Sequence, residues 1–251
     1  MNSNIRNIYD DPEVYDAAHW WKTNDIDFIC DLCETLGDPI LELGAGTGRL
    51  AQPLLARGLN YLGLDNSPAY VEWAGKKLSD FPSGKIISGD MRSFSLPQSF
   101  QTCFIGFNSI FHLMNNADIR SCFTSVFRHL NPGGYFFIDM FYPDPAFLFR
   151  EAKSYPVMEF NHPRFGPCKV EETNEYDSAT QINVITWYFH YTESERTDRY
   201  TFAMHMIFPD TMFHLLNEAG FIIQSMWGGY DKTPFTEDSD LQIYLCRKPE
   251  A

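Results

Sequence analysis

A glycine-rich segment that directly follows an apolar strand limits the folds open to this chain more than any other feature of the sequence. Ile40–Leu43 is expected to form a short buried strand, and it runs into Gly44–Gly48, which reads GAGTG. A helix with Leu50, Leu54 and Leu55 on one face is predicted to follow. Glycine accepts positive φ and lets a backbone come close to a ligand. Nicotinamide and flavin enzymes also use such turns, so the turn alone does not name the ligand.

The strand–helix unit recurs along the chain. A helix is predicted before the glycine segment, with Asn24 as its N-cap and Gly37 as its C-cap. Further helices are expected after Ser67 and over 117–130. Further strands are expected at Tyr61–Leu64, Lys85–Ser88, Cys103–Phe107 and Tyr135–Met140. Strands that alternate with helices predict right-handed βαβ units and a parallel sheet.

The pattern changes after residue 142. Three runs with β-type alternation predict three or four antiparallel strands inserted into the α/β fold; they are Lys169–Glu175, Ile182–Tyr191 and Arg199–Phe208. A helix is expected after Pro209, followed by strands at Phe221–Met226 and Leu241–Cys246. The connection over 227–240 is short for a helical crossover, so we expect the last strand to be antiparallel.

Charge and hydropathy disfavour several classes of partner and location. Lysine and arginine number 19, aspartate and glutamate number 33, and the net charge is −14. An acidic surface repels phosphate backbones and anionic lipids, which disfavours nucleic acid and membrane partners. The sequence has no apolar stretch of the ~18 to 20 residues that a membrane span needs. Residues 1–11 are polar, so we expect no secretory signal and a cytoplasmic protein.

Six cysteines are scattered along the chain. Cys30 and Cys33 form a C-x-x-C, but they fall inside a predicted helix and no second pair follows. We therefore predict buried or half-buried thiols in a reducing compartment, and no metal site.

Two details of the glycine segment argue against a dinucleotide ligand. The glycines stand as G-x-G-x-G, and the position that would complete G-x-G-x-x-G is Arg49. Glu42 precedes the loop, where a carboxylate would repel a pyrophosphate. The same carboxylate would attract an ammonium, such as the α-amino group of a methionine moiety.

Two more acidic residues follow the next strands. Asp65 ends the second strand and can accept hydrogen bonds from ribose hydroxyls, in S-adenosylmethionine as in NAD. Asp90 follows the third strand and suits an adenine amino group, with Met91 against the ring. Taken singly, each acid is also typical of a helix N-cap or a turn. Carboxylates at three successive strand ends favour S-adenosylmethionine.

These segments resemble the class I S-adenosylmethionine-dependent methyltransferases over about residues 37–141 and 209–248. The matching motifs are LELGAGTG at 41–48, GLDNS at 63–67, GDMRSF at 89–94 and LNPGG at 130–134. The resemblance implies a Rossmann-like seven-stranded, mostly parallel sheet with an antiparallel last strand. It also implies that these residues contact the cofactor: Glu42, Gly44, Ala45, Gly46, Gly48, Asp65, Asn66, Asp90, Met91, Phe107 and Asn108.

We expect three parts in the chain. Residues 37–142 and 209–251 form the cofactor-binding domain. Residues 143–208 form the inserted antiparallel β subdomain, which binds substrate. Residues 1–36 form an N-terminal helical and aromatic lid.

Methyl transfer from a sulfonium is an in-line displacement, so the protein mainly positions the reactants. A general base is needed only when the nucleophile arrives protonated. Residues 107–112, which read FNSIFH, follow the fourth predicted strand. His112 is the candidate to accept a proton from an amine or hydroxyl, with a structural role as the alternative.

The segments 89–96 and 107–113 resemble those of small-molecule N-methyltransferases that act on amino sugars of antibiotics. In those enzymes a histidine at the place of His112 lies beside the substrate amine. An N-terminal Tyr-Asp segment, matched here by Tyr15 and Asp16, folds over the cofactor. The resemblance thus implies an amine acceptor, with His112 and Tyr15 as catalytic residues. The chain departs from that group at Asn108 and Phe111.

Several aromatic and polar residues are candidates to bind the substrate, with burial in the core as the alternative. They are Tyr9, Trp20, Tyr142, Trp187 and His190. The expected function is methyl transfer to a small-molecule amine by a monomer or homodimer. The alternatives are an O- or C-methyltransferase, an NAD-dependent oxidoreductase, which Glu42 opposes, and a non-enzymatic protein that keeps the cofactor fold.

Overall fold

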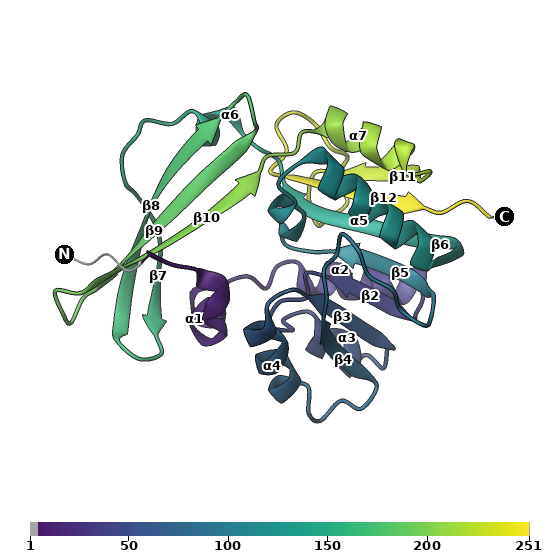
Figure 1. Cartoon of the computed structure of the whole chain (residues 1–251), viewed down its shortest axis with the longest axis horizontal. Helices are drawn as coiled ribbons and strands as arrows, with labels where there is room; N and C mark the ends of the chain where they lie inside the picture. Colours follow the sequence, from purple (N-terminus) through teal and green to yellow (C-terminus); the bar gives the residue numbers. More distant parts are fainter. Residues whose placement is uncertain (1–4, 251) are drawn as a thin grey trace. The chain divides into compact units, whose positions relative to one another are not determined.

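The strand–helix alternation builds a seven-stranded sheet (Figure 1). Its strands span Ile40–Leu43 (β2), Tyr61–Asp65 (β3), Gly84–Ser88 (β4), Phe100–Ile105 (β5), Leu130–Phe141 (β6), Ile222–Trp227 (β11) and Leu241–Arg247 (β12). The computed structural model describes residues 5–250. The strand order is β11-β12-β6-β5-β2-β3-β4, and β12 runs antiparallel to both of its neighbours while the other pairs are parallel. The predicted mostly parallel sheet with an antiparallel last strand is confirmed.

Helices cover both faces of this sheet. They span Ile26–Leu36 (α2), Ala51–Ala56 (α3), Pro68–Lys77 (α4), Asn116–His129 (α5) and Pro209–Glu218 (α7), with a short 3-10 helix at Ser109–His112 (η2). On one face, α2, α3 and α4 share a core with Phe104 and Phe137, whose rings stack at 4.8 Å. On the other face, Phe123 of α5 contacts Phe136 at 5.5 Å. Because successive strand residues alternate faces, a sheet buried on both sides needs continuous apolar runs.

Several predicted boundaries were wrong by a few residues, as for the strand predicted at Arg199–Phe208, which ends at His205, and two of them bear on the candidate site. Strand β5 ends before Phe107, because Phe107 and Asn108 have φ of +45° and +67°, which strand residues do not adopt. Helix α2 has Asp25 rather than Asn24 at its N-cap. The Asp25 side chain makes no capping hydrogen bond, because it binds the Arg49 guanidinium.

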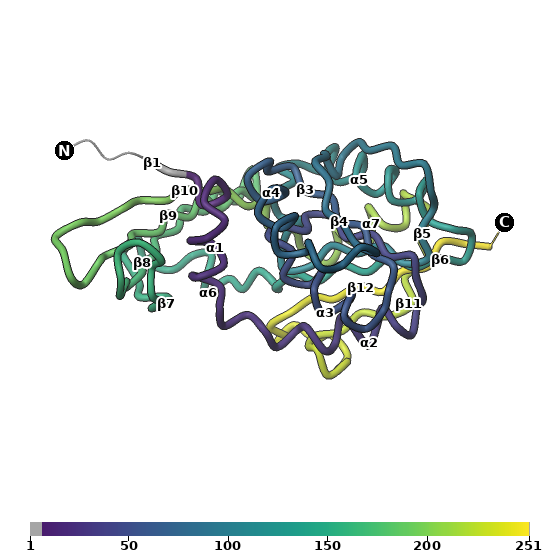
Figure 2. Tube along the Cα trace, turned by 90° about the horizontal axis from the view of Figure 1, so that it is seen from below, coloured from purple at the N-terminus to yellow at the C-terminus, as the bar shows by residue number. Residues whose placement is uncertain are grey.

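A second sheet is built mainly by the inserted segment. Its strands span Ile5–Arg6 (β1), Tyr155–His162 (β7), Gly166–Asp177 (β8), Ile182–Tyr191 (β9) and Thr197–His205 (β10), in the order β1-β10-β9-β8-β7. Strands β7 to β10 are antiparallel, which confirms the predicted insert. Strand β1 lies parallel to β10, as Figure 2 shows, a pairing that no sequence pattern predicted. Short helices span Ile8–Asp10 (η1), Pro12–Ala18 (α1) and Pro145–Leu148 (α6).

Contacts group these elements into two units. The larger comprises residues 24–142 and 207–250, and the smaller comprises residues 5–23 and 143–206. Helix α2, which we expected to belong to an N-terminal lid, lies in the larger unit, where Ile29 and Cys33 are fully buried. None of the helices in the described part of the chain is long and apolar enough to cross a membrane.

The six cysteines are buried free thiols, as predicted for the C-x-x-C pair. Cys30 and Cys33 face the core that α2 shares with the sheet. Burial raises the pKa of the Cys30 thiol to about 11.

Gly63 in β3 allows the tight packing beneath the glycine loop. A Cβ added there would lie 2.7 Å from atoms of Ala45, Ile86 and Tyr61. We expect Gly63→Ala to lower the free energy of unfolding by ~1 to 3 kcal/mol, because a well-packed core resists added volume. Urea unfolding measures this difference.

Gly75→Ala in α4 is the matched control, because a Cβ added there meets nothing within 4 Å. It should gain ~0.5 to 1 kcal/mol, since alanine favours helix over glycine. Equal stability changes in the two variants would contradict the packing argument.

Candidate cofactor and acceptor site

The glycine segment forms a left-handed turn over the end of β3. Its glycines have φ of +70°, +56° and +79° at Gly44, Gly46 and Gly48. The backbone N–H groups of Gly44 and Ala45 both donate to the carbonyl of Leu64, at 2.8 and 3.1 Å. A Cβ at Gly44 would also lie 2.7 Å from the Cβ of Ser109. Both the backbone conformation and the packing therefore require glycine at the start of the loop.

Asp65 ties the end of β3 to this loop. Its Oδ2 accepts from the Gly46 N–H at 2.7 Å, and its Oδ1 accepts from the Ser67 N–H at 2.8 Å. Burial raises the pKa of Asp65, and the two backbone donors oppose that rise. A carboxylate offers about four acceptor positions, so Asp65 retains capacity for further donors. The next residue, Asn66, is exposed.

Glu42 lies in the core beneath the loop. Its side chain is only 4% exposed, and the Tyr61 hydroxyl donates to its Oε2 at 2.5 Å. Burial raises the pKa of Glu42 to about 8, although Tyr61 and the charge of Arg49 lower it. Glu42 is therefore mainly protonated at neutral pH. A contact between Glu42 and a ligand ammonium stays a prediction.

Asp90 follows β4 and is held by Arg92. The Arg92 guanidinium donates to both carboxylate oxygens of Asp90, at 2.6 to 3.0 Å. This pairing lowers the pKa of Asp90, so the side chain is a carboxylate at neutral pH. The side chain is 40% exposed and can still accept a ligand donor. The Met91 Cε lies 3.4 Å from the position of a Cβ on Gly44, so Met91 borders the glycine loop.

The segment after β5 begins beside the glycine loop. Phe107 and Asn108 are both left-handed, and Ser109 then opens η2. The Ser109 hydroxyl donates to the carbonyl of Gly44 at 3.4 Å. His112 ends η2 and is exposed. The structure thus brings the predicted catalytic segment against the predicted cofactor loop.

The residues present fit a nucleoside ligand. A Cβ added at Gly46 would have one described neighbour within 4 Å, the Tyr70 ring at 3.9 Å, so this position of the loop is not tightly packed. Asp65 and Asp90 supply acceptors for hydroxyl and amino groups, and Met91 supplies an apolar contact. These are the groups that ribose and adenine require.

The smaller unit groups three other predicted residues through ring contacts. The Tyr9 and Tyr15 rings lie 6.1 Å apart, and Tyr15 lies 4.1 Å from the His19 ring. The His19 ring lies 5.8 Å from Trp187, whose indole N–H donates to Glu172 at 2.7 Å. Tyr9, Tyr15 and Trp187 therefore belong to one aromatic cluster on one face of the smaller sheet.

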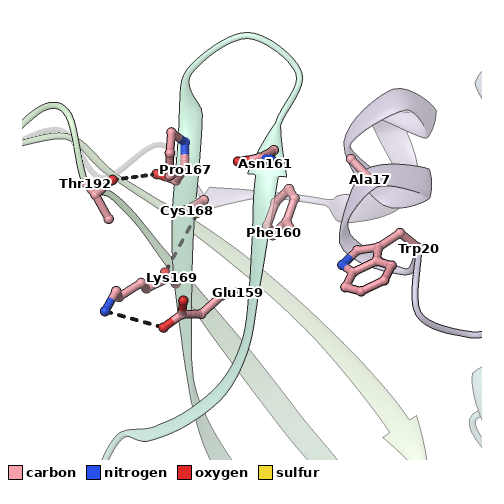
Figure 3. Close-up of a pocket in the computed structure, with 9 residues that line it drawn as sticks. All are labelled: Ala17, Trp20, Glu159, Phe160, Asn161, Pro167, Cys168, Lys169 and Thr192. Atoms are coloured by element: carbon pink, nitrogen blue, oxygen red, sulfur yellow. Dashed lines mark hydrogen bonds and ion pairs between the residues drawn. The ribbon is translucent and has the colours of Figure 1, made fainter.

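Trp20 lies elsewhere in the same unit, on a cavity of about 520 Å³ (Figure 3). Its side chain is 67% exposed, and Phe160 and Cys168 also line the cavity. Glu159 and Lys169 form an ion pair at 3.4 Å on the same cavity. The cavity has an aromatic wall and a charged rim, which suits an amphipathic ligand.

The structure does not bring all predicted substrate residues together. Trp187 is 9% exposed, whereas the His190 side chain is 44% exposed, 3.5 Å from Glu171. Residues three apart on a strand point to opposite faces, so Trp187 and His190 do not line one cavity. Tyr142 lies in the larger unit and contacts the Phe235 ring at 5.3 Å.

Sequence reasoning missed two buried carboxylates of the larger unit. Asp25 is fully buried and forms a two-point ion pair with Arg49, at 2.7 Å for each bond. Asp139 on β6 is 1% exposed and accepts from the Tyr230 hydroxyl at 3.1 Å. The sequence contained one signal for Asp139, because an acidic residue within the apolar run YFFIDM at 135–140 indicates a buried carboxylate.

The buried Glu42 predicts a pH dependence of stability. Its pKa of about 8 in the folded state exceeds the ordinary 4.5, so folding favours the protonated form between these values. Stability from Glu42 is therefore complete below about pH 4.5 and is lost as pH rises toward 8. Urea unfolding at pH 5, 6, 7 and 8 should show this fall in the natural protein and a smaller fall in Glu42→Gln.

Glu72→Gln is the control, since the Glu72 side chain is 73% exposed beside Lys76. It should leave the slope above pH 5 unchanged. If Glu42→Gln keeps the full slope, Glu42 is ionised in the folded protein.

Comparison with known proteins identifies the family. A model of the methyltransferase domain matches residues 40–134. An uncharacterised methyltransferase from Bacillus licheniformis is 30% identical over 185 residues, which cover 72% of this chain and 84% of that protein.

Solved structures share the fold over nearly the whole chain. The CcbJ methyltransferase from Streptomyces caelestis is 19% identical and has a TM-score of 0.83, with 97% of this chain and 98% of that chain covered. The amino pentose methyltransferase CalS10 from Micromonospora echinaspora is 17% identical and has a TM-score of 0.73, with 94% and 96% covered. Because of these matches and the glycine-loop motifs, we conclude that the chain belongs to the class I S-adenosylmethionine-dependent methyltransferases.

Proposed function

We propose that this methyltransferase transfers the methyl group of S-adenosylmethionine to an amine of a small molecule. The observation that carries the proposal is the position of η2, which starts against the glycine loop and ends at the exposed His112. A base beside the reacting centre is needed when the acceptor arrives protonated, as amines do at neutral pH. The similarity of the whole fold to that of an amino pentose methyltransferase supports an amine acceptor.

The larger unit supplies the residues that would hold the cofactor. When bound, the cofactor supplies a methyl group on a sulfonium, which is already activated for displacement. The left-handed turn at Gly44, Gly46 and Gly48 lets the backbone approach the ligand. Asp65 would accept from ribose hydroxyls and Asp90 from the adenine amino group.

The acceptor would be recognised partly by charge. A chain with net charge −14 attracts a cationic amine and repels anionic acceptors. His112 is then the group that accepts the proton of the ammonium, because imidazole titrates near neutral pH. Tyr15 would assist in positioning or deprotonating the acceptor.

The smaller unit would bind the rest of the acceptor. Tyr9, Tyr15 and Trp187 form an aromatic cluster that can pack against a sugar ring or an alkylammonium group. Trp20 lines a separate cavity of the same unit. Residues 143–208 remain the proposed substrate subdomain, and the proposed lid is reduced to residues 5–23, because α2 belongs to the core of the larger unit.

Asp65→Ala tests the cofactor site. The variant should bind S-adenosylhomocysteine more weakly by ~1 to 3 kcal/mol, because ribose hydroxyls lose their acceptor. Calorimetric titration measures the affinity. Asp38→Ala is the matched control, since Asp38 also accepts a backbone N–H, from Asn60 at 2.8 Å, at the opposite end of the strands. Unchanged affinity in Asp65→Ala would remove Asp65 from the site.

His112→Ala tests the acceptor chemistry. A panel of small amines and alcohols is incubated with S-adenosylmethionine, and methylated products are identified by mass. We expect amine products and a ~10² to 10⁴-fold lower kcat in His112→Ala, as for loss of a general base. His214→Ala on α7, whose side chain is 71% exposed, should keep full activity. Methylated alcohols alone would indicate an O-methyltransferase.

A further inference from the structure

Two adjacent residues without glycine's freedom adopt a left-handed backbone beside the candidate site. Phe107 has φ of +45° and Asn108 has φ of +67°. Such a conformation is rare for an aromatic residue and persists only where its surroundings hold it. The two residues lie between β5 and η2, so their conformation determines where η2 begins.

Strand β6 holds this pair through three hydrogen bonds. The Phe107 N–H donates to Asp139 Oδ2 at 3.3 Å, and the Asn108 N–H donates to the Asp139 carbonyl at 3.1 Å. The Asn108 side-chain oxygen accepts from the Phe141 N–H at 2.7 Å. The Asp139 carboxylate therefore contacts the backbone of the left-handed pair directly.

Tyr230 orients that carboxylate. It lies in the connection between β11 and β12, and its hydroxyl is 3.1 Å from both Asp139 oxygens. Its ring lies 5.4 Å from the Phe28 ring, which fixes its position against α2. Burial and the charge of Asp139 raise the pKa of Tyr230, so the phenol keeps its proton and donates.

An ion pair flanks the same segment on another side. The Arg49 guanidinium lies 5.3 Å from the centre of the Phe107 ring and binds the buried Asp25. The left-handed pair is thus packed between a cation that follows the glycine loop and a carboxylate on β6. Strand β6 and Arg49 thus contact the pair directly, and Tyr230 and Asp25 bind the groups that make these contacts.

We propose that Asp139 and Tyr230 are positioning residues of the methyltransferase, which hold Phe107 and Asn108 in the left-handed conformation that seats Ser109 and η2 against the glycine loop. This inference rests on the proposed function, because it assigns the held segment to the cofactor and acceptor site. Without these hydrogen bonds, residues 107–112 would sample other conformations. The cofactor would then bind more weakly, because only a fraction of the molecules would be in the binding conformation.

Tyr230→Phe tests the inference, with Tyr244→Phe as the matched control. Tyr244 is also a buried phenol of the larger unit, but it donates to Gln242 within β12, at 2.9 Å. Three quantities are measured for each variant: the Kd for S-adenosylhomocysteine, the melting temperature, and hydrogen exchange at amides 106–112.

Tyr230→Phe should bind S-adenosylhomocysteine about tenfold more weakly, as expected for the loss of a hydrogen bond to a charged group. Its amides at 106–112 should exchange about tenfold faster or more, since the local opening becomes easier. Tyr244→Phe should keep the natural Kd and the natural exchange at 106–112, whatever its melting temperature.

The proposal would be overturned if amides 106–112 of Tyr230→Phe exchanged hydrogen at the same rate as in the natural protein. An equal rise of the Kd for S-adenosylhomocysteine in both variants would also overturn it. If Tyr230→Phe does not fold, Asp139→Asn replaces it, because the amide keeps the size but cannot accept at both atoms. If the natural protein does not bind S-adenosylhomocysteine, the proposed function fails. In that case the exchange data alone decide whether Tyr230 holds the segment.

Discussion

Strand β2 lies at the centre of the seven-stranded sheet, between β3 and β5, and the place where it ends fixes every other part of the candidate site. The chain must leave the sheet there and enter α3, because both neighbouring positions are already filled by parallel strands. A left-handed turn achieves this within a few residues, and only glycine adopts it at low cost. The backbone N–H groups of this turn donate to the Leu64 carbonyl and to the Asp65 carboxylate at the end of β3. The same hydrogen bonds therefore fix both the glycine loop and Asp65, the proposed ribose acceptor.

The acidic residues near the glycine loop differ in protonation because their surroundings differ. Glu42 and Asp65 are both buried, yet two backbone N–H groups donate to Asp65, whereas the Tyr61 phenol donates to Glu42. Asp90 is paired with a guanidinium and stays ionised. A charged acid must be solvated or hydrogen-bonded, and an acid without enough donors keeps its proton. The carboxylates at successive strand ends therefore differ in the charge they present to a ligand.

Glu172 of the smaller unit is a buried carboxylate beside the aromatic cluster. Glu172 accepts from the Trp187 indole and also from Arg150, at 2.6 Å. The Arg150 guanidinium lies 4.5 Å from the centre of the Tyr155 ring and also bonds to Asn174. Because the buried carboxylate accepts from both Trp187 on β9 and Arg150 in the connection before β7, it orients the Trp187 indole. Trp187, one member of the aromatic cluster that we propose for acceptor binding, is therefore held by a hydrogen bond to a buried group.

The sequence by itself determined the alternation of strands and helices along the chain, the antiparallel last strand, the glycine turn and the resemblance to the family. Periodicity and glycine positions encode these features locally, since a buried parallel strand must be apolar on both faces. The tertiary structure decided what the local pattern could not. It placed Glu42 in the core, brought Trp187 into one cluster with Tyr9 and Tyr15, and ended β5 before Phe107. It also brought Tyr230 to Asp139 across 91 positions of the chain. Burial and pairing between distant segments set the charge and orientation of a side chain, and no periodicity in one sequence records which distant residues will meet.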